Sequence, residues 1–273
     1  AVVVDAANGA ASFVAADVFG RTGARVVVIN DRPDGTNIND RCGATSTEGL
    51  AAAVVAERAD VGIALDGDAD RVIAVDERGA IVDGDHIMAM CAIDLHDRGR
   101  LQADTVVVTV MTNLGFRLGM SDRGIEVIDT AVGDRYVLEA LTAGGYTLGG
   151  EQSGHVLFAD HATTGDGILT AVALLDAVRR SGRPLAELAG DAMTSLPQVL
   201  VNVRVARRLP DVADRLADEI AAAERELGGT GRILVRASGT EPLVRVMVEA
   251  PTHDQAQSVA NSVAAAARLL PGT

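Results

Sequence analysis

Apolar and polar positions alternate in two ways along the first third of the chain. Short runs rich in Val and Ile predict strands, and Ala-rich stretches with wider apolar spacing predict helices. The predicted strands are 2–4, 25–29, 61–65 and 71–75, and the predicted helices are 10–19 and 47–58. Strand, helix and strand in succession are typical of a sheet covered by helices. We therefore predict an α/β domain over residues 1–82.

The same pattern restarts at Gly84. It predicts a helix through Met88 and Ile93, strands at 105–111, 126–129 and 146–148, and helices after Asn113, at 136–141 and at 166–179. Residues that break helices and strands then follow, at Gly182, Pro184 and Pro197. These elements predict a second α/β domain over residues 83–196.

Strands and helices are interleaved differently beyond that point. The pattern predicts strands at 199–205, 232–235 and 243–249, with helices at 212–227 and 255–269. Two of these strands follow each other directly, which favours a small α+β domain over residues 197–273. The predicted fold class is α/β: two consecutive α/β domains with mixed sheets covered by helices, followed by a small α+β C-terminal domain.

Composition and charge narrow the classes of function. Hydrophobic residues make up 48% of the chain against 23% charged, which indicates a globular protein. The formal net charge of -14 argues against nucleic acid as a partner, because binding to phosphate backbones needs surplus Lys and Arg. Cys42 and Cys91 do not form a CxxC pair, which fits a reducing compartment. No apolar run approaches the roughly 18 residues of a spanning helix, so we predict a cytoplasmic protein without a membrane partner.

The first candidate site lies between two predicted strands. Residues 66–71 read Asp-Gly-Asp-Ala-Asp-Arg, and Gly67 permits a tight turn that brings Asp66, Asp68 and Asp70 together. Convergent carboxylates favour a divalent cation, and oxygen ligands suit Mg²⁺. A calcium loop is disfavoured because Arg71 stands where such loops require Gly, although an acidic residue, Glu77, falls at the twelfth position. A solvated acidic turn is the simpler alternative.

The second candidate site follows the strand predicted near residue 148. Residues 149–155 read Gly-Gly-Glu-Gln-Ser-Gly-His, and Glu151, Ser153 and His155 offer the donors and acceptors that suit sugar hydroxyls. A polar connecting loop is the alternative interpretation. A nucleophilic Ser153–His155 pair is disfavoured, because the two residues are too close in sequence and no strand-to-helix elbow surrounds them.

The third candidate site lies between the last two predicted strands. Residues 236–242 read Arg-Ala-Ser-Gly-Thr-Glu-Pro, and Arg245 follows on the next strand. Two arginines, two hydroxyls and a glycine form a plausible anion-binding loop. The residues that would form it are Arg236, Ser238, Gly239, Thr240 and Arg245. An ordinary turn with surface arginines is the alternative.

Taken in this order and at these separations, the three loops resemble the metal-binding, sugar-binding and phosphate-binding loops of the α-D-phosphohexomutase family. Further stretches at 37–40, 82–85, 109–115, 132–137 and 163–167 are similar to the family as well, so the resemblance covers the whole chain. Ala69 departs from the family, where Gly is usual. Gln152 is typical of members that act on glucosamine phosphates, whereas relatives acting on mannose or glucose phosphates tend to carry Met or another residue there.

One family feature does not occur in these 273 residues. The family carries its phosphorylated serine in a Thr-Ala-Ser-His-Asn-Pro-like loop of a first domain, so the chain resembles domains two to four only. The abrupt start inside a strand-like run fits a missing upstream part. We therefore expect the missing N-terminal domain to be a partner of this chain, and the chain alone to be inactive.

The resemblance implies an isomerase that transfers phosphate within one sugar. Asp66, Asp68 and Asp70 would hold Mg²⁺ and Arg71 would act as a catalytic residue beside it, while the residues of the second and third loops would bind a phosphorylated hexosamine. The expected reaction interconverts glucosamine 6-phosphate and glucosamine 1-phosphate through a phosphoserine and a bisphosphate, for the synthesis of cell-wall amino sugars. The alternatives are a mutase for mannose or glucose phosphates, a non-catalytic sugar-phosphate-binding fragment, and a metal-dependent phosphatase with Asp66 as nucleophile.

Overall fold

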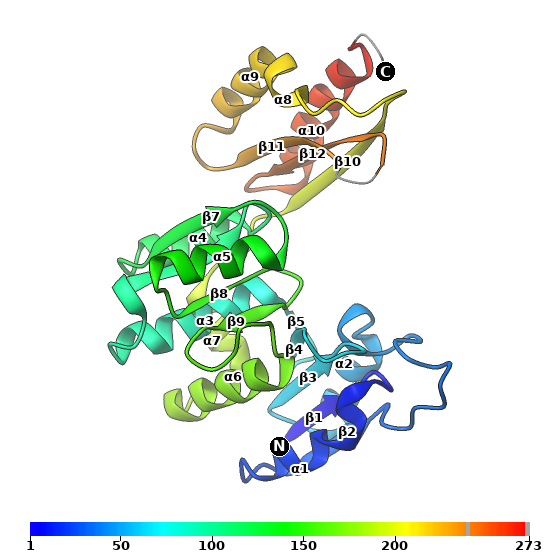
Figure 1. Ribbon diagram of the computed structural model, residues 1–273, viewed down its shortest axis with the longest axis vertical. Helices are drawn as coiled ribbons and strands as arrows, with labels where there is room; N and C mark the ends of the chain where they lie inside the picture. Colours follow the sequence, from blue (N-terminus) through cyan, green and yellow to red (C-terminus); the bar gives the residue numbers. More distant parts are fainter. Residues whose placement is uncertain (239–240, 271–273) are drawn as a thin grey trace. The chain divides into compact units, whose positions relative to one another are not determined.

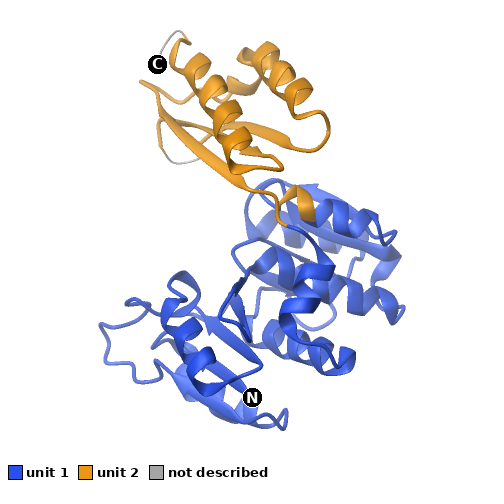
Figure 2. Cartoon of the chain, turned by 180° about the vertical axis from the view of Figure 1, so that it is seen from behind, with its two compact units in different colours: residues 1–112, 116–194 blue, residues 113–115, 195–273 orange. Residues whose placement is uncertain are grey.

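A computed structural model describes residues 1–238 and 241–270. The chain forms two compact units (Figure 2). Unit 1 comprises residues 1–112 and 116–194, and unit 2 comprises residues 113–115 and 195–273. The predicted boundary between residues 82 and 83 falls inside unit 1, and the predicted start at residue 197 lies two residues after the main segment of unit 2 begins.

The first sheet of unit 1 has the strand order β2-β1-β3-β4-β5 (Figure 1). Its strands are β1 Val2–Asp5, β2 Val26–Ile29, β3 Val61–Leu65, β4 Val72–Asp76 and β5 Ile81–Val82. Strands β2, β1 and β3 run parallel, and β4 and β5 pair antiparallel beyond them. The connecting helices are α1 Ala15–Gly20 and α2 Glu48–Glu57, with short 3-10 turns at Ala10–Phe13 and Gly43–Thr45.

Both faces of this sheet are covered. Val2 and Val4 pack into a core on one face, while Val3 packs on the other face in a cluster with Leu50 and Val54 of α2. Strands buried on both faces read as unbroken apolar runs, which explains why β1, β3 and β4 were recognisable from sequence.

The second sheet of unit 1 has the order β7-β6-β8-β9. Its strands are β6 Thr105–Thr109, β7 Glu126–Thr130, β8 Leu148–Gly150 and β9 Val156–Phe158, of which only β9 is antiparallel to its neighbour. The helices are α3 Gly84–Asp97, α4 Leu114–Ser121, α5 Asp134–Gly144, α6 Gly167–Ser181 and α7 Leu185–Ala192. Leu65 and Val72 of the first sheet share one apolar core with Met88 of α3, Val106 of β6 and Leu174 of α6. The two sheets of unit 1 are therefore joined by a continuous core.

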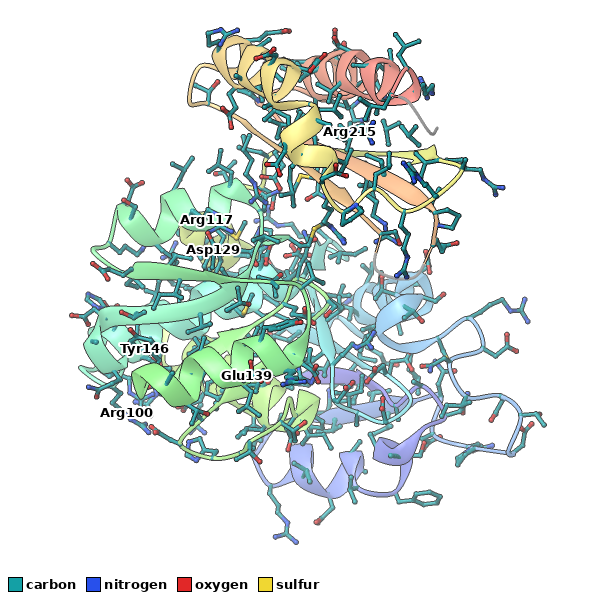
Figure 3. All side chains as sticks on the ribbon, turned by 45° about the horizontal axis from the view of Figure 1, so that its top comes forward. Arg100, Arg117, Asp129, Glu139, Tyr146 and Arg215 are labelled. Atoms are coloured by element: carbon teal, nitrogen blue, oxygen red, sulfur yellow. The ribbon has the colours of Figure 1, made fainter. Side chains whose placement is uncertain are left out.

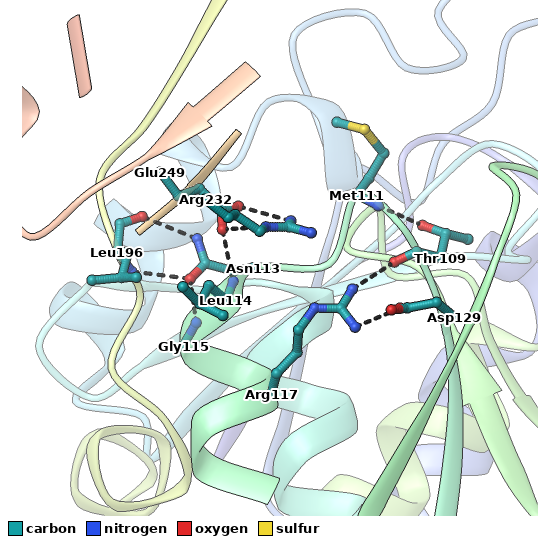
Figure 4. A network of polar contacts seen from close by, with 10 residues as sticks. All are labelled: Thr109, Met111, Asn113, Leu114, Gly115, Arg117, Asp129, Leu196, Arg232 and Glu249. Carbon is teal, nitrogen blue, oxygen red and sulfur yellow. Dashed lines mark hydrogen bonds and ion pairs between the residues drawn. The ribbon is translucent and has the colours of Figure 1, made fainter. Parts of the chain in front are cut away.

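An ion pair holds α4 against the second sheet. Arg117 of α4 donates to the carboxylate of Asp129 in β7 and, at 3.4 Å, to the carbonyl of Thr109 in β6 (Figures 3 and 4). One side chain thus fixes the helix to two neighbouring strands.

Unit 2 is a three-stranded antiparallel sheet of order β10-β12-β11 covered by helices. Its elements are β10 Gln198–Arg204, α8 Val212–Arg215, α9 Ala217–Leu227, β11 Arg232–Ala237, β12 Leu243–Glu249 and α10 His253–Arg268. A separate apolar core, which includes Val203, Val246 and Val263, holds this unit together.

Residues 113–115 belong to unit 2 because polar contacts bind them there (Figure 4). Asn113 exchanges two hydrogen bonds of 3.0 Å with the backbone of Leu196. The fully buried carboxylate of Glu249 accepts from the Leu114 amide at 2.8 Å and from Arg232 at 2.7 and 3.1 Å.

The α/β fold class predicted from sequence is confirmed, with three sheets and their covering helices. Three short elements, β5, β9 and α7, were not predicted. The helices predicted at 10–19 and 212–227 are each interrupted, since a 3-10 turn precedes α1 and Leu216 separates α8 from α9. The strand predicted at 146–148 begins two residues later, at Leu148. Among the described residues, no helix is long and apolar enough to cross a bilayer.

Candidate active site

The Asp-rich loop connects β3 to β4 as a hairpin, with Leu65 paired to Val72. One carboxylate oxygen from each of Asp66, Asp68 and Asp70 lies within 4.8 Å of the other two. The predicted convergence of the three side chains is therefore present in the fold. Asp66 is buried, Asp70 is half-buried and Asp68 is exposed, so the cluster opens to solvent on one side.

The electrostatics of this cluster fit a cation. Burial, together with the neighbouring Asp70 and Asp68, raises the pKa of Asp66 to about 6, against the lowering effect of the Arg71 amide. The Oδ1 atom of Asp70 is buried without a hydrogen-bond donor among the described residues. Arg71 Nε approaches Asp66 and Asp70 only to 3.5 and 3.6 Å. The negative charge is thus incompletely neutralised, and oxygen-only ligands of this kind suit Mg²⁺.

Hydrogen bonds within the Asp-rich loop fix the conformation of its backbone. The Arg71 amide donates to Asp66 Oδ1 at 3.1 Å, and the Ala69 amide donates to the Asp66 carbonyl at 3.1 Å. Ala69 adopts a φ of 63°, a left-handed conformation that favours glycine. The family preference for Gly at this place has its physical reason in that φ value. The Ala69 carbonyl accepts from Gly167 at the start of α6, which fixes the loop from the other side.

The Glu-Gln-Ser loop is the hairpin between β8 and β9, with Gly150 paired to Val156. Glu151 accepts from the Gly133 amide at 3.1 Å, and Gln152 donates to Asp83 at 3.3 Å. Ser153 is exposed. The loop is therefore tied to its surroundings through the two side chains that directly precede the exposed Ser153.

Unit 1 brings these two loops together. The Val72 amide, at the end of the Asp-rich loop, donates to the Gly154 carbonyl at 3.1 Å. Gly154 has a φ of 90°, and a Cβ atom there would lie 2.0 Å from the Val72 carbonyl. Only glycine allows so close an approach of the two backbones.

His155 lies at the junction of the two loops. Its ring is buried, with Nε2 3.6 Å from Asp70 Oδ2 and with Nδ1 unpaired among the described residues. The backbone of Gly165 packs against the ring, since a Cβ at that position would be 2.4 Å from Nε2. The structure therefore places His155 beside Asp70 of the Asp cluster, and the role in sugar binding expected from sequence stays a prediction.

The Arg-Ser loop lies in unit 2. Arg236 of β11 and Arg245 of β12 are directly paired in the sheet. Burial lowers the pKa of Arg236, and the charge of Arg245 lowers it further. Two guanidinium groups held together in this way favour an anion between them. Ser238 is buried beside them, while Gly239 and Thr240 lie outside the described residues.

Several residues of these sites were not assigned from sequence. Gly133 and Asp83 hold the Glu-Gln-Ser loop, and both lie in stretches, 132–137 and 82–85, that the sequence analysis noted only as similar to the family. Arg208 lines a cavity of about 520 Å³ together with Arg236 and Ser238. Neither its charge nor its place beside Arg207 distinguishes Arg208 from other arginines of the chain, so sequence alone gave no signal for it.

The comparisons with known proteins agree with this geometry. The phosphoglucomutase/phosphomannomutase models for α/β/α domains II and III match residues 1–79 and 83–196, and the model for the C-terminal domain matches residues 200–266. Phosphoglucosamine mutase from Frankia alni is 60% identical over 268 residues, covering 98% of this chain and 59% of that protein. The phosphoglucosamine mutase of Thermobifida fusca is 56% identical and also covered to 59%. The chain thus spans about three-fifths of the length of these relatives.

Solved structures give the same fold. A phosphoglucomutase/phosphomannomutase family protein from Burkholderia thailandensis superposes with a TM-score of 0.81 at 24% identity, covering 100% of this chain and 61% of that one. An N-acetylphosphoglucosamine mutase from Aspergillus fumigatus, in complex with GlcNAc-6P and magnesium, gives a TM-score of 0.79 at 25% identity, covering 98% and 65%. With three family models matched in order and relatives this similar, the chain belongs to the phosphoglucomutase/phosphomannomutase family, also called the α-D-phosphohexomutases.

Proposed function

We propose that this chain supplies the metal-, sugar- and phosphate-binding loops of a mutase that interconverts glucosamine 6-phosphate and glucosamine 1-phosphate. The observation that carries the proposal is the contact between the Asp cluster and the Glu-Gln-Ser loop, through Val72 with Gly154 and Asp70 with His155. The phosphoglucosamine mutases of Frankia alni and Thermobifida fusca support the choice of sugar.

Asp66, Asp68 and Asp70 would hold Mg²⁺ in the proposed enzyme. The magnesium in the Aspergillus fumigatus mutase complex and the convergence of the three carboxylates support this choice. The ion would neutralise charge on the phosphoryl group during transfer. Arg71, whose guanidinium lies next to Asp66 and Asp70, would contribute further positive charge at the same place.

The protein side chains orient the sugar. Ser153 is exposed directly after the anchored Glu151 and Gln152, so its hydroxyl can exchange hydrogen bonds with the substrate. Glu151 offers a carboxylate to sugar hydroxyls or to the amine, since only its Oε1 atom accepts from Gly133. His155 would hold Asp70 in place beside the metal, and its contact with the sugar stays a prediction.

The phosphate that does not react would bind in unit 2. Arg236, Arg245 and Ser238 provide charge and a hydroxyl for it, and the family resemblance adds Gly239 and Thr240. Holding one phosphate at a fixed place allows the sugar to present either end to the reacting site, which the exchange of 1- and 6-phosphates needs.

The transferred phosphate would come from a serine that the 273 residues do not contain in its family context. In the proposed reaction a phosphoserine from an N-terminal domain phosphorylates the sugar, and the resulting bisphosphate returns its other phosphate to the serine. We place this enzyme in the cytoplasm, where its product would feed the synthesis of cell-wall amino sugars. The chain without that domain would bind substrate but not turn it over.

The test is a comparison of sugars with the full-length protein. We expect glucosamine phosphate to be turned over with a higher kcat/KM than glucose or mannose phosphate, and Asp68→Asn to lose most of the activity because it removes a metal ligand. The exposed Asp122→Asn serves as the matched control. A wide preference for glucose or mannose phosphate would contradict the proposed substrate.

A non-catalytic role is the second candidate, because the binding loops are present while the serine motif is not. In that case the 273-residue chain would bind glucosamine 6-phosphate without turnover, even when supplied with a bisphosphate primer. Mutase turnover by the chain alone would exclude this candidate, and calorimetry with Arg245→Ala would show whether binding depends on unit 2.

A further inference from the structure

A buried carboxylate outside the Asp cluster lies at the same edge of the first sheet. Asp5 is the last residue of β1 and is fully buried. It pairs with Ala64 of β3, two residues before Asp66. Because β1 and β3 are parallel, the loops that follow them leave the sheet side by side.

The two oxygens of Asp5 hold two separate loops. Oδ1 accepts from the Ala7 amide and Oδ2 accepts from the Gly43 amide, both at 2.9 Å. Ala7 and Asn8 have φ values of 54° and 47°. This left-handed conformation is tolerated by Asn but unfavourable for Ala, and at Ala7 it persists only when the surroundings impose it. The carboxylate supplies that constraint. Because both oxygens face amide groups, Asp5 is not itself part of the metal-binding cluster.

Both loops touch the backbone of the Asp-rich loop. The Ala10 amide donates to the Gly67 carbonyl at 2.8 Å. A Cβ atom on Gly9 would lie 2.3 Å from that carbonyl, and one on Gly43 would lie 2.5 Å from the carbonyl of Leu65. The backbone between Leu65 and Gly67 is therefore confined on two sides by the segments that Asp5 holds.

We infer that Asp5 is a positioning residue for the proposed metal site, acting through the backbones of residues 7–10 and 43 on the loop that carries Asp66 and Asp68. The inference rests on the proposed metal-binding function. It explains why a carboxylate is needed: two amide donors require two acceptor oxygens, and an Asn side chain offers only one.

The first test is Asp5→Asn, with Asp76→Ala as the control, because Oδ1 of Asp76 alone accepts both of its amides and an Asn there would keep both bonds. Asp76 is also buried and also holds a turn, accepting from the amides of Arg78 and Ala80 at 2.9 and 2.8 Å. It pairs with Val61, at the opposite end of β3 from Asp66. Both variants should lose stability, but only Asp5→Asn should disturb the metal site.

The measurement is titration of each variant with Mn²⁺ as a paramagnetic substitute for Mg²⁺, alongside hydrogen exchange of backbone amides. We expect Asp5→Asn to weaken Mn²⁺ binding about tenfold, as outer contacts of metal sites do. It should also speed the exchange of amides in residues 66–71. Asp76→Ala should leave Mn²⁺ binding unchanged and speed exchange only around residues 77–80.

A second variant keeps the test decisive if Asp5→Asn does not fold. Ala10 is exposed and begins a 3-10 turn after an extended Gly9, a position that accepts proline. Ala10→Pro removes the amide that donates to Gly67, whereas Ala10→Ser keeps it. We expect Ala10→Pro to weaken Mn²⁺ binding severalfold with a nearly unchanged melting temperature, and Ala10→Ser to match the wild type.

The outcomes separate the two proposals. If wild-type protein binds no Mn²⁺, the proposed metal function fails, and amide exchange in residues 66–71 still decides the role of Asp5. If wild-type protein binds Mn²⁺ while Asp5→Asn and Ala10→Pro bind it equally well and exchange residues 66–71 no faster, the inference about Asp5 is wrong and the metal function stands.

Discussion

The pKa of Asp66 shows how strongly the surroundings of a single residue change its protonation. Its carboxylate is buried beside two other acidic groups, so its pKa in the metal-free fold is about 6, above its ordinary value of 3.8. Between these values the folded chain binds more protons than the unfolded chain, and the free energy of unfolding falls as pH rises. This contribution to stability is present below about pH 4 and is lost by about pH 6.

A prediction follows for Asp66→Asn, measured by urea unfolding in a chelator between pH 4 and pH 7. The variant should lose less stability than the wild type as pH rises through this window, because the titrating group is gone. The exposed Asp122→Asn, which removes a negative charge elsewhere, should follow the wild type. Equal slopes for wild type and Asp66→Asn would contradict the burial argument.

At this scale, sequence identified residues whose chemistry is unusual and missed those whose position is unusual. Asp66, Asp68 and Asp70 stand out because three carboxylates alternate within five positions. Asp5 and Asp83 do not belong to so dense a cluster, and each accepts a hydrogen bond from an amide 38 or 69 positions away. Contacts of that kind depend on strand order and on loop closure, which no local pattern contains.

Two helical glycines, Gly84 and Gly49, differ in how much space surrounds them. Gly84 begins α3, and a Cβ atom there would lie 2.5 to 2.6 Å from backbone atoms of Glu151, Gln152 and Gly154. Gly49 of α2 would meet nothing within 4 Å. Substitution of glycine by alanine should therefore have opposite effects on stability in the two helices.

We expect Gly84→Ala to destabilise the protein and to displace the Glu-Gln-Ser loop, because all three crowded atoms are backbone atoms that cannot rotate away. Gly49→Ala should stabilise it by up to about 1 kcal/mol through helix propensity. Thermal unfolding gives the sign for each, and binding of glucosamine 6-phosphate should weaken only in Gly84→Ala. A neutral Gly84→Ala would show that the loop can shift freely.

Elements buried on both faces were predicted well, and short ones were not. β3 has the predicted bounds because its apolar run is unbroken, and β12 has them although Arg245 interrupts its apolar run. β9 has three residues and β5 has two, too few for a period to be recognised. α7 begins directly after Pro184, a residue that the sequence pattern indicated only as a break between elements. Proline is in fact compatible with the first turn of a helix.

At the scale of the whole molecule, the two units have separate cores, so each has its own stability. Glu249 is central to unit 2, since its buried carboxylate joins β11, β12 and residue 114 (Figure 4). A substitution that removes the charge of Glu249 would break its ion pair with Arg232.

We therefore predict that Glu249→Gln destabilises unit 2 by about 3 kcal/mol and leaves unit 1 nearly unchanged. Calorimetry should show a transition that moves to lower temperature and another that does not. The exposed Glu226→Gln of α9 is the control and should move neither. A uniform shift of all transitions would mean that the units unfold as one.

The continuous core of unit 1 limits how this chain can be recombined with its relatives. A crossover near residue 82 would divide an apolar interior to which Leu65, Met88 and Leu174 all contribute, so the two parents would have to match in shape over many side chains. A crossover near residue 196 would leave this interior whole, and it would separate Asn113 and Leu114 from their hydrogen-bond partners Leu196 and Glu249. Exchange of sugar preference between family members is therefore expected to succeed when residues 1–194 are transferred as a block.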